Sequence, residues 1–356
     1  MRIKNIFRIF LSVFFTITLF SACNQEETEP YLVLTTTAVT DITQTGAKSG
    51  GTIKCSDKYV KILLAGVCWA TYPNPSTFRN YTDITFDIDI NKKDTAIVND
   101  STGVKYKSSF NNLKPGTTYY LRAYAETGSG TTTYGNEIVF GTTMTDIDKN
   151  IYHVVTIGTQ TWMVENLRTT RYNDSIPIPL VEPNATWKNP LPAIAPAYCW
   201  YNDVIGNKKT YGALYNWDAV NTGKLAPKGW HVPTNTDWTT LEKYVGAHSG
   251  RSGTLAKALS DSIIWSASTL DGTIGFDIKT NNSTGFSALP GGYRDYSDGK
   301  FYKAGTAISF WSATNKAKGI SNDSICGRRF NSESKIFDDI TFFNKKNGFY
   351  VRCVKD

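Results

Sequence analysis

The residues with the most evident chemistry lie between positions 291 and 298, where two glycines precede tyrosines and charged side chains. Asp295 and Asp298 are a pair of carboxylates of the kind that glycoside hydrolases use. They flank an Asp-Gly turn, however, where acids usually cap the turn or face water, so the pattern does not favour catalysis. Tyrosine rings beside charged arms and flexible backbone instead suit a sugar ligand. The candidate ligand-binding residues are Tyr293, Arg294, Asp295, Tyr296 and Asp298.

The first 22 residues predict a lipoprotein signal peptide. Arg2, Lys4 and Arg8 form a basic region, and residues 9–20 form an apolar stretch. This stretch is too short to span a bilayer, which needs about 20 apolar residues. Small residues then precede Cys23, so we expect cleavage before Cys23, lipidation of its thiol and attachment to a membrane through that lipid. An ordinary signal peptide with a cysteine nearby is the alternative.

Residues 23–30 are polar and acidic without periodicity, which predicts a solvated tether. The segment resembles the acidic signal that sends Bacteroidetes lipoproteins to the outer face of the outer membrane. The expected location is therefore the outer membrane, with exposure at the cell surface.

Composition limits the remaining functions. The chain of 356 residues carries 38 basic and 31 acidic residues. Without Arg2, Lys4 and Arg8 the excess falls to four charges, which is too weak and too dispersed to predict nucleic-acid binding. Three histidines and no Cys-x-x-Cys pair make a metal site unexpected. No cofactor is expected.

Residues 31–143 predict an all-β sandwich. Short runs rich in β-branched and aromatic residues alternate with turn residues; these runs are 31–36, 51–54, 60–69, 81–90, 106–110, 118–125 and 133–140. Cys55 and Cys68 lie on neighbouring predicted strands and could form a disulfide bond, although alternation does not fix their directions.

A tyrosine corner sharpens this prediction. Tyr119 lies six residues after Leu113 in LKPGTTYYLRAYA (113–125). We expect its hydroxyl to bond a backbone group across the corner between two strands. Residues 119, 121, 123 and 125 should then face inward, and 120, 122 and 124 outward. With GVCW (66–69) and YGNE (134–137), the segment resembles a bacterial fibronectin type III-like domain, and such domains mostly act as spacers. Residues 144–150 predict a polar, acidic linker.

Residues 151–356 carry eight of the nine tryptophans, so this half should build an aromatic core. Its motifs are IGTQTWMVENLRTTRYND (157–174), YCWYND (198–203), YGALYNW (211–217), APKGWHVPTNTDW (226–238), GFSALPGGYRD (285–295), FWSAT (310–314) and GFYVRCV (348–354). In this order they closely resemble the Fibrobacter succinogenes major paralogous domain. That family is a variant of the C-type-lectin-like α+β fold and is related to sulfatase-modifying factors. The resemblance implies the fold; the family has no well-defined activity.

Local signals place the elements of this half. Residues 152–157 and 160–164 predict a hairpin, and the prolines at 177, 179, 183, 190, 192 and 196 exclude helix and interior strand in that segment. Thr234 and Asp237 form a capping box for a helix that Gly246 can end. Residues 254–260 predict a second, short helix. Phe310–Ser312 and Tyr350–Arg352 predict core strands.

The resemblance bears on the cysteines and on chemistry. The family often has a cysteine at the position of Ala226, and its absence leaves Cys199–Cys353 as the preferred disulfide bond, with Cys326 unpaired. Sulfatase-modifying factors need a closely spaced cysteine pair near the C-terminus, and Cys326 and Cys353 lie 27 residues apart. The resemblance therefore implies no such enzyme.

Two short sequences imitate the calcium motifs of C-type lectins, namely Glu182-Pro183-Asn184 and Asn202-Asp203. Both precede the first helix, whereas lectins carry them after it, so we interpret the match as coincidence. The resemblance also implies that Tyr293 and Arg294 belong to the framework of the domain. The expected protein is thus a surface lipoprotein that binds without catalysis, with a glycan as the first candidate ligand. A protein-binding or structural surface role is the alternative, and a sulfatase-modifying type of enzyme is less favoured.

Overall fold

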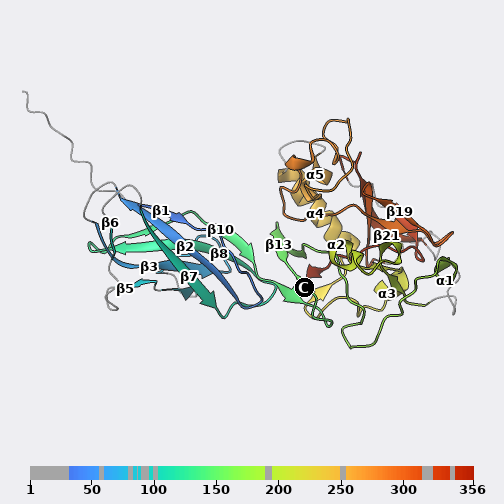
Figure 1. The fold of residues 1–356 in the computed structure, drawn as a ribbon, viewed down its shortest axis with the longest axis horizontal. Helices are drawn as coiled ribbons and strands as arrows, with labels where there is room; N and C mark the ends of the chain where they lie inside the picture. Colours follow the sequence, from blue (N-terminus) through green and yellow to red (C-terminus); the bar gives the residue numbers. More distant parts are fainter. Residues whose placement is uncertain are drawn as a thin grey trace, which may run out of the picture.

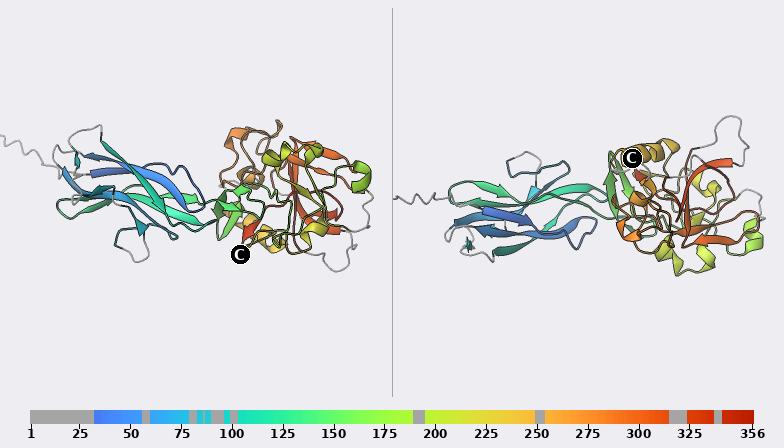
Figure 2. Two further views of the ribbon diagram at one scale, coloured as in Figure 1. Left: turned by 60° about the horizontal axis from the view of Figure 1, so that its bottom comes forward. Right: turned by 90° about the horizontal axis from the view of Figure 1, so that it is seen from above.

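A computed structural model describes residues 32–55, 60–78, 83–85, 87–89, 96–98, 103–188, 195–248, 254–314, 324–336 and 341–356. These residues form two lobes placed end to end (Figures 1 and 2). The predicted signal peptide, the acidic tether and the predicted lipidation site Cys23 lie outside the described residues. Residues in strands greatly outnumber residues in helices, so the chain is β-rich. Among the described residues, none of the helices combines the length and apolar character needed to cross a membrane.

Two antiparallel sheets form the first lobe. One sheet has the order β1-β2-β7, with β1 (Leu32–Thr36), β2 (Gly46–Cys55) and β7 (Val104–Asn111). The other has the order β10-β8-β3-β4, with three short strands paired to β3 and β8. Its strands are β3 (Val60–Ala70), β4 (Asp83–Ile84), β5 (Ile88–Asp89), β6 (Ala96–Val98), β8 (Thr118–Thr127), β9 (Thr132–Tyr134) and β10 (Ile138–Gly141). Two apolar clusters take side chains from both sheets, so the sheets pack face to face.

The tyrosine corner is confirmed. The Tyr119 hydroxyl accepts a hydrogen bond from the Lys114 backbone N–H at 2.9 Å, and the ring stacks on Phe140 with centroids 5.8 Å apart. The predicted alternation of β8 fails at one position, because Tyr124 is buried. Its hydroxyl donates to the Thr85 carbonyl at 2.6 Å, so a chain segment beyond β3 covers this ring.

The segment predicted as a linker, residues 144–150, folds onto the second lobe. Met144–Thr145 (β11) pairs with Ile151–Tyr152 (β12), and Met144 lies in the core of the second lobe. Asp146 is buried too, and the four hydrogen bonds that its carboxylate accepts compensate for the loss of water. A polar sequence can therefore be interior when its charges are fully hydrogen-bonded, which composition alone does not reveal.

The lobes also contact each other directly. The Lys355 ammonium near the C-terminus donates to the Gly116 carbonyl at 2.8 Å and to the Thr117 hydroxyl at 3.2 Å. The hydroxyl oxygens of Thr118 and Thr156 lie 2.6 Å apart. The C-terminus consequently lies at the junction of the lobes (Figure 1).

The second lobe contains one sheet of four strands and one of five. The first has the order β13-β14-β23-β17, with β13 (Val154–Ile157), β14 (Gln160–Met163), β23 (Val354–Lys355) and β17 (Trp230–His231). The second has the order β19-β18-β20-β21-β22, with β18 (Gly291–Arg294), β19 (Phe301–Ala304), β20 (Ala307–Trp311), β21 (Ser324–Asn331) and β22 (Thr341–Asn344). A two-stranded pair adds β15 (Tyr198–Cys199) and β16 (Leu214–Tyr215). The predicted hairpin is confirmed as β13–β14. Residues 350–352 are buried as predicted but form only an isolated bridge.

Short helices connect these sheets. They are α1 (Asn184–Lys188), α2 (Asn207–Tyr211), α3 (Trp217–Val220), α4 (Asn235–His248) and α5 (Leu255–Leu259), with 3-10 turns at Tyr201–Asp203 and Ile278–Thr280. The capping box of α4 is confirmed, because the Asp237 carboxylate accepts from the Thr234 N–H at 2.8 Å and the Thr234 hydroxyl from the Asp237 N–H at 3.2 Å. The helix continues two residues beyond Gly246. Helix α1 was not expected among prolines; it starts directly after Pro183, whose carbonyl accepts from Trp187.

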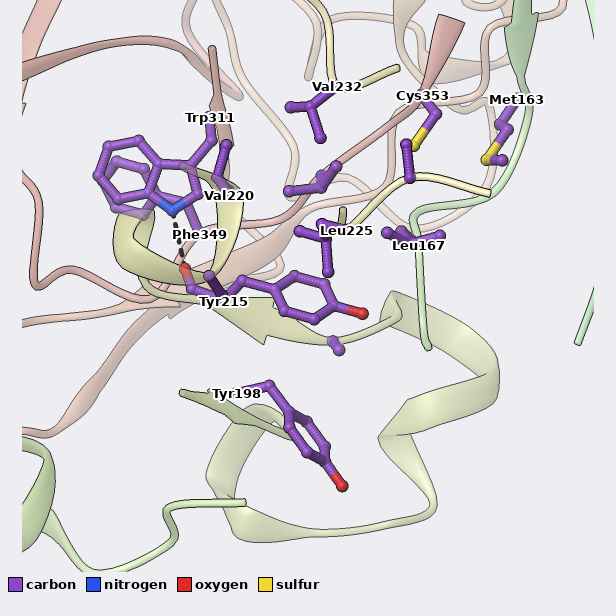
Figure 3. Packing of buried hydrophobic residues seen from close by; sticks show 14 of the residues in the cluster. Met163, Leu167, Tyr198, Tyr215, Val220, Leu225, Val232, Trp311, Phe349 and Cys353 are labelled. Carbon is purple, nitrogen blue, oxygen red and sulfur yellow. Dashed lines mark hydrogen bonds between the residues drawn. The ribbon is translucent and has the colours of Figure 1, made fainter. Parts of the chain in front are cut away.

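Two clusters of aromatic and aliphatic side chains form the core of the second lobe. In one of them Trp311 packs on Phe349 with centroids 4.4 Å apart and donates its indole N–H to the Tyr215 carbonyl at 2.7 Å (Figure 3). Three arginines with under 2% exposure lie in the interior of this lobe, namely Arg294, Arg328 and Arg352.

Neither predicted disulfide bond forms. All five described cysteines are free thiols, namely Cys55, Cys68, Cys199, Cys326 and Cys353. Cys55 ends β2, whereas Cys68 lies eight residues into β3, roughly 26 Å along that strand, far beyond the reach of a disulfide bond. Cys199 and Cys353 belong to different core clusters.

Candidate functional site

The candidate residues lie on the hairpin that β18 and β19 form. Tyr293 pairs with Tyr302 and Arg294 with Phe301, so neighbouring side chains point to opposite faces of the sheet. Gly292 has a φ of 73°, and an added Cβ would lie 2.2 Å from the Tyr302 carbonyl oxygen. Only glycine fits this position, which explains the glycine pair before Tyr293.

Arg294 lies on the inner face and is fully buried. Its guanidinium donates to the Gly299 carbonyl at 2.7 Å and to the Val181 carbonyl at 2.7 Å. It also lies 4.5 Å from the ring centroids of Trp187 and Phe301. These contacts tie the hairpin to the segment before α1. The prediction that Arg294 contacts a ligand is therefore wrong, and its role as a framework residue is the one that the structure supports.

The two segments that imitate calcium motifs meet at this same guanidinium. Arg294 donates to the Glu182 carbonyl, to the Asn184 side-chain oxygen at 3.2 Å and to an Asp203 carboxylate oxygen at 3.4 Å. The segments are thus close in space, although each precedes α4 in the chain. The guanidinium cation of Arg294 therefore occupies the place where these oxygens converge. Burial raises the pKa of Asp203, while Arg294 acts to lower it.

The two carboxylates of the hairpin are used within its turn. Asp295 accepts from the N–H of Ser297 at 2.8 Å and from its hydroxyl at 2.6 Å. Asp298 accepts from the Lys300 N–H at 2.9 Å and from the Tyr302 hydroxyl at 2.6 Å. The bond from Tyr302 lowers the pKa of Asp298. A glycosidase acid requires a raised pKa, so Asp298 lacks the electrostatics of that role.

The outer face of the hairpin presents aromatic rings to solvent. The rings of Tyr293 and Tyr302 lie 6.0 Å apart with an angle of 36° between them. Tyr302 is 39% exposed, and Tyr296 in the turn is 40% exposed. The structure therefore brings Tyr293 and Asp298 together around Tyr302, and it leaves Tyr296 exposed in the adjoining turn.

Tyr293 also borders a hollow of about 540 Å³ over β18, β20 and β21. Arg329 lies 4.4 Å above the Tyr293 ring and donates to the Ser309 hydroxyl at 2.8 Å. Polar residues complete the lining, namely Lys303, Thr306, Asn331, Ser332 and Glu333. The hollow thus combines an aromatic edge with charged and neutral polar groups.

Sequence reasoning missed Tyr302, Lys303 and the residues of β21. Only the pairing of β18 with β19 and the sheet order place them beside Tyr293. The Asp298-Gly299 turn was a usable signal for the returning strand, because such turns join hairpins. Nothing local to β21 indicates that it lies in this sheet. Among the described residues, no group of three His, Cys, Asp or Glu side chains could hold a metal ion.

Comparison with known proteins adds the family. The family profile of the Fibrobacter succinogenes major domain matches residues 155–355. Among solved structures, similar ones include the sensor domain of the anti-sigma factor RsgI4 in Pseudobacteroides cellulosolvens. A short form has 16% identity and a TM-score of 0.22, and the match covers 31% of this chain and 93% of that chain. A solution structure has 14% identity and a TM-score of 0.22, covering 32% and 75%. Comparison with curated proteins gave no match.

Proposed function

Because the chain belongs to the Fibrobacter succinogenes major domain family, we propose that it is a surface-anchored lipoprotein that binds a glycan without catalysis. In this proposal residues 31–143 are a fibronectin type III-like stalk and residues 151–356 a C-type-lectin-like head. The facing sheets and the corner at Tyr119 support the stalk. The return of β23 to pair with β14 and β17, together with the capped α4, supports the head.

The outer face of the β18–β19 hairpin carries the proposal. Tyr302 and Tyr296 expose their rings, and Asp298 holds the Tyr302 hydroxyl in place. An exposed flat ring covers the apolar face of a sugar, and neighbouring polar groups bond its hydroxyls. The adjoining hollow supplies such groups from Lys303, Asn331 and Glu333. A shallow site of this kind suits binding free energies of about −4 to −8 kcal/mol, or millimolar to micromolar affinity.

The thiols argue for binding over the chemistry of sulfatase-modifying factors. Burial raises the pKa of Cys326 and of Cys353, so both thiols stay protonated at neutral pH. Reactive cysteines have depressed pKa values. Cys326 lies on β21 and Cys353 directly before β23, and within the described part of the chain neither forms a disulfide bond.

A glycan array with residues 24–356, which lack the signal peptide and the lipidated Cys23, tests the proposal. We expect at least one glycan to bind, and Tyr302→Ala or Tyr296→Ala to remove the signal. Tyr244→Ala is the matched control, because Tyr244 on α4 is also 40% exposed. An array without any positive glycan, or equal signals from all variants, would favour a protein-binding or structural role instead.

Membrane attachment needs its own test. Labelling cells with a fatty-acid analogue should mark the wild-type protein and leave Cys23→Ala unmarked, because the thiol is the lipid acceptor. Protease treatment of intact cells should then remove the head if it is at the surface. Equal labelling of both proteins would exclude the lipid anchor.

A further inference from the structure

A second hollow lies at the junction of the lobes, where the segment predicted as a linker folds against the second lobe. Its volume is about 290 Å³, near the lower end for small-molecule sites. Its cationic lining residues are Lys149, Arg171 and Lys228, and Thr145, Thr169 and Asn173 add hydroxyl and amide groups. The hairpin of β18 and β19 lies on the side of the head away from the stalk (Figure 1), so the two hollows are separate.

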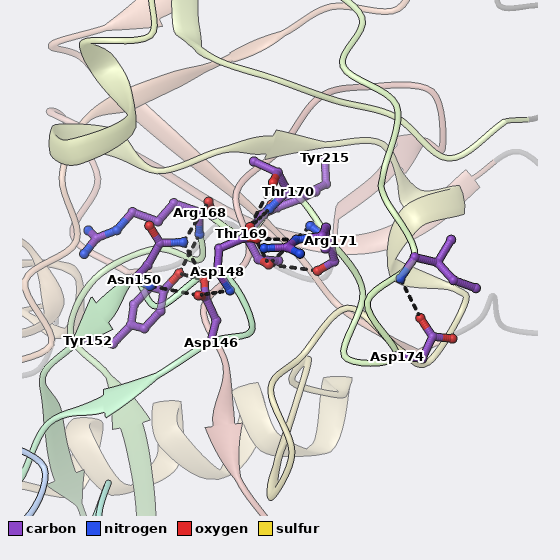
Figure 4. Close-up of polar contacts among 11 residues, drawn as sticks. Asp146, Asp148, Asn150, Tyr152, Arg168, Thr169, Thr170, Arg171, Asp174 and Tyr215 are labelled. Atoms are coloured by element: carbon purple, nitrogen blue, oxygen red, sulfur yellow. Dashed lines mark hydrogen bonds and ion pairs between the residues drawn. The ribbon is translucent and has the colours of Figure 1, made fainter.

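The two carboxylates at this hollow, Asp146 in its lining and Asp148 beside Arg171, are already hydrogen-bonded. Asp146 accepts from the N–H groups of Asp148 and Asn150 at 2.9 Å each, and from the Tyr152 hydroxyl at 2.6 Å. Asp148 accepts from the Thr170 N–H at 2.6 Å and pairs with the Arg171 guanidinium at 2.7 Å (Figure 4). Burial acts to raise the pKa of Asp148, but these bonds lower it. The carboxylates therefore serve to fix the wall and to orient Arg171.

Unlike Asp148 and Arg171, the two lysines of the lining have no ion-pair partner among the described residues. Lys149 and Lys228 are exposed, and in the part of the chain that the structure describes neither ammonium group has a carboxylate within ion-pairing distance. Lys224, by contrast, forms an ion pair with Asp174 at 2.8 Å, so its charge is neutralised. Asp146 in the lining and Asp148 beside Arg171 offset two of the three positive charges, which leaves the hollow with an excess of one positive charge.

We propose that this junction hollow binds the carboxylate of an acidic sugar unit, such as a uronic acid. The lysine ammonium groups would bond the carboxylate through charge-assisted hydrogen bonds, and Thr145, Thr169 and Asn173 would face the ring hydroxyls. The inference rests on the proposed glycan function but uses another surface. Thr145 and Lys149 come from the segment between the lobes, so the site depends on the folding of that segment against the second lobe. An acidic polysaccharide could then engage the junction and the hairpin together, which raises its overall affinity.

Titration calorimetry at low salt tests this site with tri-galacturonate and the non-lipidated chain, residues 24–356. Lys149→Ala/Lys228→Ala should weaken binding by about tenfold or more, as expected for losing charge-assisted hydrogen bonds. Lys209→Ala/Lys243→Ala removes the same charge from two exposed helical positions and should change the affinity less than twofold. Thermal denaturation checks that both double variants fold.

The ligand arms separate the possible sources of a carboxylate. The methyl ester of tri-galacturonate should bind much more weakly, and citrate should not compete at equal concentration. Tyr302→Ala should leave the affinity for tri-galacturonate unchanged. The glycan site on the hairpin and the site in the junction hollow can therefore be tested independently. The proposal is overturned if no acidic oligosaccharide binds, if the ester or citrate binds as well, or if both double variants weaken binding equally.

Discussion

The cores of the two lobes differ in composition and in the regularity of their strands. The stalk buries alternating apolar residues of regular strands, such as Leu121, Ala123 and Ala125 on β8. The head has short strands and long connections, and it buries whole arginine side chains among aromatic rings. Arg294, Arg328 and Arg352 each bond backbone carbonyls or polar side chains from distant segments. Where regular hydrogen-bonded ladders are short, buried donors satisfy the carbonyls that the connections leave open.

The two faces of the β18–β19 hairpin show a similar contrast between a structural role and a proposed binding role. Its inner face carries Arg294, which fixes the hairpin to the connection before α1. Its outer face carries Tyr302, which has one hydrogen bond to Asp298 and a largely exposed ring. We therefore expect changes on the inner face to affect stability and changes on the outer face to affect binding.

The largest effect should come from Arg294→Met. The substitution leaves the carbonyls of Val181, Glu182 and Gly299 without their donor in a buried site. We expect a loss of about 3–5 kcal/mol in the free energy of unfolding. Tryptophan fluorescence during urea denaturation reports on the head, which holds eight of the nine tryptophans. Arg294→Lys keeps the charge without the planar fork and should recover only part of the loss; full recovery would contradict this account.

Tyr119→Phe tests the stalk in the same terms. The ring should stay packed on Phe140 while the Lys114 N–H loses its acceptor. We expect a cost of about 1–3 kcal/mol. Circular dichroism of the stalk alone, residues 31–143, would show it as a lower denaturation midpoint. Tyr120→Phe is the control, since Tyr120 is half-buried on the same strand. Similar shifts for both variants would exclude a special role for the corner.

A smaller effect should follow from Lys355→Met at the junction. The ammonium bonds the Gly116 carbonyl and the Thr117 hydroxyl, so its loss weakens the contact between lobes. We expect about 1 kcal/mol, because hydrogen bonds to a partly exposed charge contribute modestly. Calorimetric unfolding of the mature chain should show the transitions of the two lobes moving apart. Unchanged transitions would mean that Lys355 does not couple them.

The smallest effect should be a pH dependence from His153 and Glu165, whose Nδ1 and Oε1 atoms lie 2.7 Å apart. The bond to Glu165 raises the pKa of His153 above 6.5; burial acts to raise the pKa of Glu165, but His153 lowers it below 4.5. The contribution is therefore fully present between about pH 4.5 and 6.5, fades as pH rises through the raised pKa of His153, and fades as pH falls through the lowered pKa of Glu165. Because the pair is largely exposed, we expect less than about 1 kcal/mol. His153→Gln should flatten the dependence of stability between about pH 6 and 8, and an identical profile in both proteins would remove this pair from the account.

The sequence predicted what local patterns determine. The strand runs at 60–69 and 118–125, the hydroxyl bond of Tyr119, the hairpin at 154–163 and the capping box of α4 depend on local sequence, and each is present. The site was predicted in part, because Tyr293 and Tyr296 precede a recognisable turn. Arg294 appeared as a polar arm, since a sequence does not show that carbonyls from residues 181 and 182 meet it.

The remaining errors have a common cause. Asp146 and Met144 were assigned to a linker because composition does not show that Met144 packs into a core cluster or that Asp148, Asn150 and Tyr152 donate hydrogen bonds to Asp146. Cys199 and Cys353 were paired because spacing does not place residues in one core cluster or the other. Tyr302 and the residues of β21 were missed because sheet order brings them to the site. Contacts between distant segments therefore carried the information that the sequence did not.

The most direct test of the central claim is calorimetric titration of the strongest glycan from the array into wild type, Tyr302→Ala and Tyr302→Phe. The account predicts millimolar to micromolar binding to wild type, a loss of about tenfold or more in Tyr302→Ala, and a loss of less than about threefold in Tyr302→Phe, which keeps the ring. Equal affinities in all three proteins, or no binding to wild type, would contradict the claim that the outer face of this hairpin is a glycan site.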